Sequence, residues 1–134
     1  MDLSYLFTPF FAWIITGIAK FINNCFNTKR LAFDLIGYGG MPSNHSAIVA
    51  STASIIAFKE GISHPAFGVA ITLAFIVILD AHGLRGEVEK HSKAINKLKS
   101  TDSFRESFGH NKCEIFWGII VGILSAWLIH LLYN

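Results

Sequence analysis

Four apolar stretches, separated by polar segments, run along the chain at about residues 5–21, 46–58, 65–79 and 115–133. The last stretch has about 19 residues, with His130 as its only strongly polar side chain, and is long enough to cross a bilayer as a helix. Helices of a soluble bundle are polar on one face, whereas these stretches are apolar nearly all round. The pattern therefore predicts an all-α, polytopic membrane helix bundle with about four transmembrane helices, formed by residues 1–134 as a single domain.

Two of these regions have a further character. The second stretch is rich in Ser, Thr and Ala, which is typical of an inner helix that packs closely against its neighbours. Residues 80–100 continue the third stretch as a helix beyond the membrane, because apolar side chains recur there at helical spacing beside a charged face; they are Leu84, Val88, Ile95 and Leu98. We expect this helical extension to lie near the lipid headgroups, and residues 100–109 to form a polar loop.

Composition and charge support membrane integration and give it a direction. Hydrophobic residues make up 52% of the chain and charged residues only 15%, which is low for a soluble protein. Of the 11 Lys and Arg residues, Lys59 alone falls on the side that holds both termini and the 59–64 turn. The others fall on the side of the two longer segments, 22–43 and 80–113, so the positive-inside rule places these segments in the cytoplasm. With a net charge of only +2, and its basic residues at a membrane face, the chain is not expected to bind nucleic acid.

The first candidate for chemistry is the segment Gly-Gly-Met-Pro-Ser-Asn-His-Ser at 39–46, which leads directly into the second apolar stretch. Backbone N–H groups at a helix N-terminus attract anions such as phosphate, and Ser43 and Asn44 add side-chain donors. His45 is a titratable group in the same turn. Ser and Asn are also ordinary N-cap residues, so plain helix capping is the alternative interpretation.

A second candidate, Gly109-His110-x-x-x-Glu114, lies at the start of the last apolar stretch. His110 and Glu114 are one helical turn apart, so the carboxylate can bind one ring nitrogen and leave the other free as a nucleophile or base. His45 would then be a second imidazole, placed to protonate a leaving oxygen. The alternative for the His110–Glu114 pair is a simple ion pair at a helix start.

Fixed positive charge accompanies both candidates. Lys29, Arg30 and Arg85 lie at the ends of the first and third apolar stretches, and Arg is suited to bidentate contact with phosphate. The predicted topology puts all these polar clusters on one membrane face, where ionisable groups are costly and usually functional. Headgroup contact is the alternative role for the cations. A metal centre of His, Asp and Glu is conceivable, but no His-x-x-x-His or Cys-x-x-Cys pair supports one, and we expect no cofactor.

These motifs resemble those of the divergent branch of the type 2 phosphatidic acid phosphatase superfamily, which are membrane relatives of acid phosphatases and vanadium haloperoxidases. The 39–46 segment is similar to the Pro-Ser-Gly-His motif of the superfamily. Asp80-Ala81-His82-Gly83-Leu84-Arg85 and the later Asn96-Lys97-Leu98 resemble the middle motif of the divergent branch. Gly109-His110-x-x-x-Glu114 resembles its final motif.

The resemblance implies a role for each candidate. His110 would form a phosphohistidine, Glu114 would orient it, and His45 would be the general acid for the leaving alcohol. The groups that would hold the phosphate oxygens are Lys29, Arg30, Ser43, Asn44 and Arg85, with Lys20 and Asp80 as further candidates. The first motif of the superfamily, Lys-x(6)-Arg-Pro, has no complete match here, so Lys20, Lys29 and Arg30 remain alternatives for its phosphate-binding position.

The sequence thus favours a lipid phosphate phosphatase whose active site faces the cytoplasm. Its partners would be the bilayer and a phospholipid substrate such as phosphatidylglycerophosphate or phosphatidic acid. One alternative is an isoprenyl (undecaprenyl) diphosphate phosphatase, which would need the opposite orientation. The other is a catalytically inactive membrane protein that binds phospholipid. The oligomeric state stays open, a homo-oligomer included.

Overall fold

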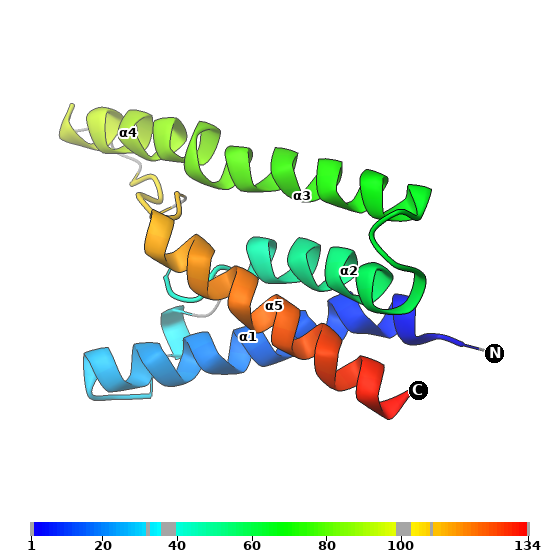
Figure 1. The fold of residues 1–134 in the computed structure, drawn as a ribbon. Helices are drawn as coiled ribbons and strands as arrows, with labels where there is room; N and C mark the ends of the chain where they lie inside the picture. Colours follow the sequence, from blue (N-terminus) through cyan, green and yellow to red (C-terminus); the bar gives the residue numbers. More distant parts are fainter. Residues whose placement is uncertain (1, 32, 36–39, 99–102, 108, 134) are drawn as a thin grey trace.

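The computed structural model describes residues 2–31, 33–35, 40–98, 103–107 and 109–133 (Figure 1). Within these residues the chain is helical and contains no strand, as the apolar pattern predicts. The elements in chain order are α1 (Ser4–Thr28), the short 3-10 helix η1 (Phe33–Leu35), α2 (Asn44–Glu60), α3 (Pro65–His82), α4 (Leu84–Lys97) and α5 (Lys112–Leu132).

Three helical segments of the described chain are long and apolar enough to cross a membrane: Ser4–Thr28, Pro65–Lys97 and Lys112–Leu132. The second helix, α2, has 17 residues and lies among them, in contact with α1, α3 and α5. Its buried side chains are mostly small, Ala47, Ala50 and Ser51 among them. The prediction that this Ser- and Ala-rich stretch is an inner helix is therefore confirmed.

Two glycines on α5 allow it to approach α2 closely. A Cβ atom added at Gly118 would lie 2.5 Å from the carbonyl oxygen of Ser43, and one at Gly122 would collide with the carbonyl oxygen of Ala47. Small residues four apart are a common device for bringing two membrane helices into backbone contact. The largest helix–helix interface of the described chain, between α2 and α5, is built on this approach.

The inner face of α1 carries small or polar residues at every fourth position. All of them are buried: Ser4, Thr8, Ala12, Thr16 and Lys20. The hydroxyls of Thr8 and Thr16 donate hydrogen bonds to the carbonyl oxygens of Ser4 and Ala12, four residues earlier in the same helix. Large apolar side chains such as Phe10 and Trp13 are exposed instead, as expected for a surface that meets lipid.

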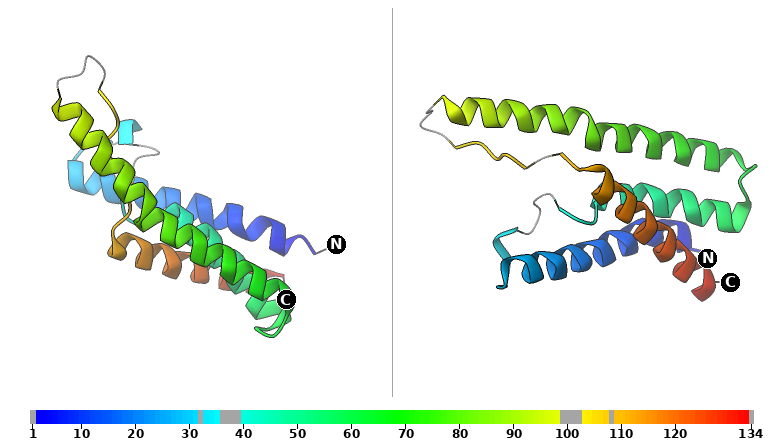
Figure 2. Two further views of the ribbon diagram at one scale, coloured as in Figure 1. Left: turned by 90° about the horizontal axis from the view of Figure 1, so that it is seen from above. Right: turned by 60° about the vertical axis from the view of Figure 1, so that its left-hand side comes forward.

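The two ends of the bundle differ in composition. Both termini and the turn between α2 and α3 lie at one end, where Lys59 pairs with Asp2 at 2.5 Å and the Tyr5 hydroxyl donates to Glu60 (Figures 1 and 2). The end of α1, the start of α2, the α3–α4 junction and the start of α5 lie at the other end. The predicted gathering of the polar clusters at one end of the bundle is therefore confirmed.

The helical extension after the third apolar stretch is also present, with an interruption. Gly83, with a ψ of −80°, separates α3 from α4, which still follows α3 in nearly the same direction (Figure 2). Its apolar side chains at Leu84, Val88 and Ile95 are exposed, so this face is available to headgroups. The end of the predicted extension, residues 99–100, lies outside the described residues, as do 101, 102 and 108 of the predicted loop.

Candidate active site

The start of α5 holds His110 and Glu114 in direct contact. The Glu114 Oε2 atom lies 3.0 Å from His110 Nδ1 and also accepts a hydrogen bond from the Asn111 backbone N–H at 3.0 Å. The Asn111 side chain in turn accepts from the Glu114 N–H, which completes a capping box. An ionised carboxylate only accepts hydrogen bonds, so the proton of His110 is on Nδ1 and the lone pair is on Nε2. Capping and orientation of the imidazole are thus performed by one carboxylate.

The backbone around His110 forms hydrogen bonds with residues of α3 and α4. The His110 N–H donates to the carbonyl oxygen of Ala81 at 3.0 Å, and His82 Nδ1 lies 3.1 Å from the carbonyl oxygen of His110. The Gly109 N–H donates to Glu89 Oε2 on α4. The motifs of the sequence indicate no role for His82 or Glu89. These contacts cannot be inferred from the order of the motifs, because they depend on the path of the loop that precedes α5.

The start of α2 lies against the start of α5. Ser43 is the N-cap of α2, is fully buried, and donates its backbone N–H to the carbonyl oxygen of Glu114 at 2.9 Å. The ring of His45 then lies beside that of His110, with 5.9 Å between the ring centroids. Ser43 therefore positions the second imidazole, and its hydroxyl is engaged with Ser46. Its capping interpretation is confirmed.

Two buried polar atoms at this point have no hydrogen-bond partner among the described residues. They are Oδ1 of Asn44 and Nδ1 of His45. Buried polar groups are nearly always satisfied, and exceptions call for an explanation such as a ligand or bound water. Both atoms lie at the start of α2, where the His45 ring is beside that of His110, so they are candidates for contact with a bound molecule.

Two cations belong to the same cluster. Lys20, from the inner face of α1, has only 8% of its surface exposed and interacts electrostatically with Glu114, His45 and His110. Arg85 is within electrostatic range of both imidazoles and pairs through Nε with Asp80 at 3.0 Å. The Asp80 carboxylate thereby fixes the guanidinium and leaves its other N–H groups for an anion.

The structure sets Lys29 and Arg30 apart from this cluster. They follow Lys20 by nine and ten residues, which is roughly 13 Å or more along a helix axis, and they line a separate groove. Arg30 pairs with Asp34 at 2.8 Å. Of the three alternatives for the phosphate-binding position of the first motif, only Lys20 lies with the imidazoles.

The protonation state of His110 follows from its surroundings. Burial lowers the pKa of the imidazole, and the positive charges of Lys20 and Arg85 act in the same direction. The hydrogen bond to Glu114 opposes this effect, but the net direction is downward. His110 is therefore neutral at pH 7, which is the form that a nitrogen nucleophile requires.

The fold and the site together define a polytopic helical membrane protein with a paired-imidazole, cationic cluster at one end. A family model described as the Divergent PAP2 family matches residues 1–125, and the chain belongs to this family. The chain is also 29% identical over 143 residues to the "Uncharacterized membrane protein YuiD" of Bacillus subtilis (strain 168), covering 91% of this chain and 88% of that protein. No solved structure matches the chain. Membership indicates a phosphatase-like integral membrane protein and confirms the family resemblance drawn from the motifs.

Proposed function

We propose that the protein is a lipid phosphate phosphatase that hydrolyses a phosphate monoester through a phosphohistidine on His110. The observation that carries the proposal is the pairing at the start of α5. Glu114 holds Nδ1 of His110 at 3.0 Å, and the His45 ring lies 5.9 Å away, centroid to centroid. This pairing supplies an oriented nucleophile and a second titratable group in one cluster.

In the first step, the Nε2 lone pair of His110 attacks phosphorus and the P–O bond to the lipid breaks. The leaving oxygen takes a proton from the imidazolium of His45, so the products are a lipid alcohol and a phosphohistidine. The negative charge of a bound phosphate favours the protonated form of His45 before this step.

In the second step, a water molecule attacks the phosphorus of the phosphohistidine. His45, now neutral, takes the proton of this water, and the P–N bond breaks with its electron pair returning to Nε2 of His110. Inorganic phosphate leaves, and both imidazoles regain their starting protonation. The Glu114 carboxylate stabilises the developing positive charge on the His110 ring.

Positive charge for the phosphoryl oxygens comes from the protein in this mechanism. Lys20 and Arg85 are the cations of the cluster, the Asn44 amide and the α2 N-terminus add donors, and Asp80 positions Arg85. We assign Ser43 to positioning, because its hydroxyl is engaged with Ser46. Lys29 and Arg30 take no part in this mechanism, because they lie beyond Lys20 along the chain and away from the two imidazoles.

The substrate we favour is a phospholipid monoester such as phosphatidylglycerophosphate or phosphatidic acid, reached from the cytoplasmic leaflet. The support is the charge distribution, since the end that holds the cluster also holds nearly all the Lys and Arg residues. Hydrolysis of an isoprenyl diphosphate from the outer face is the second candidate.

The direct test is phosphate release from a panel of lipid phosphates in detergent micelles, with and without excess chelator. We expect release by the wild-type protein in both conditions. His110→Ala should lower it by at least about 10³-fold, as for other covalent nucleophiles. His91→Ala, an exposed histidine on α4, is the matched control and should retain activity.

Circular dichroism and gel filtration would establish that both variants are folded. Full activity in His110→Ala would overturn the nucleophile assignment. A wild-type protein that binds the lipids but releases no phosphate would favour the inactive lipid-binding alternative. Loss of activity in chelator, with recovery on adding Mg²⁺, would overturn the metal-free mechanism.

A further inference from the structure

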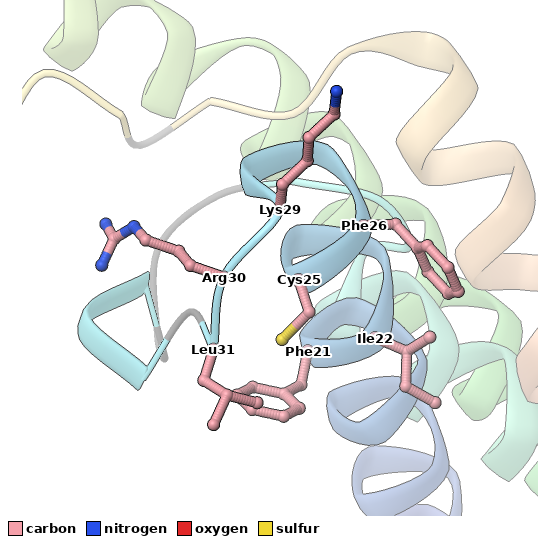
Figure 3. Close-up of a pocket in the computed structure, with 7 residues that line it drawn as sticks. All are labelled: Phe21, Ile22, Cys25, Phe26, Lys29, Arg30 and Leu31. Carbon is pink, nitrogen blue, oxygen red and sulfur yellow. The ribbon is translucent and has the colours of Figure 1, made fainter.

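A separate groove of about 450 Å³ lies at the end of α1, and neither His45 nor His110 is among the residues that line it. Figure 3 shows the lining residues. Its walls are mainly apolar, with Phe21, Phe26 and Leu31 among them, and its polar margin is formed by Lys29 and Arg30. Phe26 and Leu31 are strongly exposed, at 78% and 68% of their surfaces. The proposed mechanism does not use any of these residues.

The backbone of Lys29 creates the groove. Lys29 ends α1 in the left-handed conformation, with a φ of 52°, which reverses the chain so that Leu31 returns beside Phe21 (Figure 3). The rings of Phe21 and Phe33 lie 5.1 Å apart and hold η1 against the helix. Non-glycine residues adopt this conformation uncommonly, and such residues cluster at ligand clamps.

The position of the groove along α1 matches the headgroup level of a bilayer. The 25 residues of α1 span about 37 Å, which exceeds the roughly 30 Å of the hydrocarbon core. The end of the helix therefore reaches the phosphate region, while Phe21 and Ile22 remain at the depth of acyl chains. An apolar groove that ends in two cations at this depth is complementary to a lipid with a negative headgroup.

The two cations differ in their present partners. Arg30 pairs with Asp34 at 2.8 Å, and both side chains are more than half exposed. Lys29 forms no ion pair with any residue that the structure describes, and Figure 3 shows its amine projecting away from the helix. A phosphodiester group can therefore bind the Lys29 amine directly. It can also bind the Arg30 guanidinium while that group still contacts Asp34.

We propose that this groove binds an anionic phospholipid of the bilayer as a site distinct from the catalytic cluster. One acyl chain would lie along Phe21, Cys25 and Leu31, which gather on one side of α1 in Figure 3, and the phosphodiester would contact Lys29 and Arg30. The proposal does not depend on the proposed phosphatase activity, because a phosphodiester lipid is not a phosphate monoester.

The test measures lipid binding to the full chain in detergent by native mass spectrometry. The probes are dioleoylphosphatidylglycerol and, as the zwitterionic control with the same acyl chains, dioleoylphosphatidylcholine. We expect Lys29→Gln/Arg30→Gln to weaken binding of the anionic lipid about tenfold or more, from two lost contacts of near-surface cations. Lys90→Gln/Lys93→Gln on α4 removes the same charge and should leave binding within about twofold of wild type.

A second variant, Cys25→Trp, fills the groove without changing its charge and should also weaken binding of the anionic lipid. His110→Ala should bind the lipid as the wild type does. Equal losses in the two lysine-containing double variants would overturn the proposal in favour of general electrostatic attraction. Unchanged binding in Lys29→Gln/Arg30→Gln, equal affinity for the two lipids, or full displacement by excess inorganic phosphate would overturn it as well.

Discussion

At the scale of single residues, the site depends most on Glu114. One of its oxygens accepts from both the Asn111 N–H and the His110 ring, so the same atom caps α5 and orients the imidazole. An amide in place of the carboxylate can still accept the backbone hydrogen bond through its oxygen, but it carries no negative charge. The capping role and the electrostatic role can therefore be separated by substitution.

Glu114→Gln is expected to keep the fold and to slow phosphate release by about 10- to 10⁴-fold, by analogy with loss of the aspartate in a Ser-His-Asp triad. The physical reason is that the imidazolium character of His110 in the transition state loses its negative partner. Single-turnover phosphate release, with thermal unfolding in detergent as the control, would measure this. An unchanged rate would show that Glu114 only caps the helix.

The pKa of His110 sets the acid limb of the pH–rate profile. Because burial lowers this pKa below the ordinary 6.5, we expect kcat/KM to stay high down to a pH below 6.5 and to fall as His110 becomes protonated. In Glu114→Gln the limb should move further toward acid, because the negatively charged acceptor that raises the pKa of His110 has been replaced by a neutral one. A limb at or above pH 6.5 in the wild-type protein would contradict the assignment of His110 as the neutral nucleophile.

At the scale of helices, the distance between the imidazoles is set by the contact of α5 with α2. The Gly118 and Gly122 positions leave no room for a side chain against the α2 backbone. Ser43, the N-cap of α2, is bonded to Glu114 at the same crossing. A change in helix separation is therefore transmitted to His45 and His110 without any substitution of a site residue.

Gly118→Ala is expected to destabilise the fold by about 1–3 kcal/mol, the range for overpacking, and to lower phosphate release by separating α2 from α5. Gly68→Ala on α3 is the control, because nothing lies within 4 Å of a Cβ at that position. It should leave both properties near the wild-type level. Chemical unfolding in detergent and the release assay would measure the two effects, and a neutral Gly118→Ala would contradict the close-approach interpretation.

The helices themselves were predictable because lipid imposes a simple pattern, long apolar runs interrupted by polar segments. The i,i+4 spacing of His110 and Glu114 likewise predicted their contact. The choice of Lys20 over Lys29 and Arg30 was not predicted, because it depends on which face of α1 is buried. The buried stripe Ser4, Thr8, Ala12, Thr16 and Lys20 carries this information in its spacing of four, but only packing shows which stripe faces inward.

The contacts of His82 and Glu89 with the loop before α5 had no local signature. They join residues 20 and more positions apart through irregular backbone. Loop paths are the part of a structure that hydrophobic periodicity describes least, since no repeating pattern constrains them. The site could thus be predicted as a set of motifs, and its backbone supports could not.

At the scale of the whole molecule, the two ends of the helix bundle differ in charge and in the groups they carry. The site, the α4 helix and nearly all the cations lie at one end, and both termini lie at the other (Figure 1). With the bundle in a bilayer, the two ends face different compartments. The positive-inside rule predicts that the end with the candidate site faces the cytoplasm.

Single cysteines at Lys97 and Ser63, in a background lacking Cys25 and Cys113, test this orientation. Both positions are exposed. Position 63 lies in the turn before α3, and position 97 lies at the far end of α4. An impermeant thiol reagent applied to intact cells should label position 63 and leave 97 unlabelled until the cells are opened. The reverse pattern would place the site outside and would favour an isoprenyl diphosphate as substrate.

The inner face of α1 has a consequence for how the protein is made. Because the hydroxyls of Thr8 and Thr16 bond to carbonyls of their own helix, this face needs no other helix to satisfy them when it enters lipid. Lys20 is different: its charge meets Glu114, which belongs to α5 and is synthesised after α1. During biogenesis α1 can therefore insert early as an independent segment, whereas the lysine gains its counter-charge only when α5 arrives. Completion of the candidate site then coincides with the docking of α5.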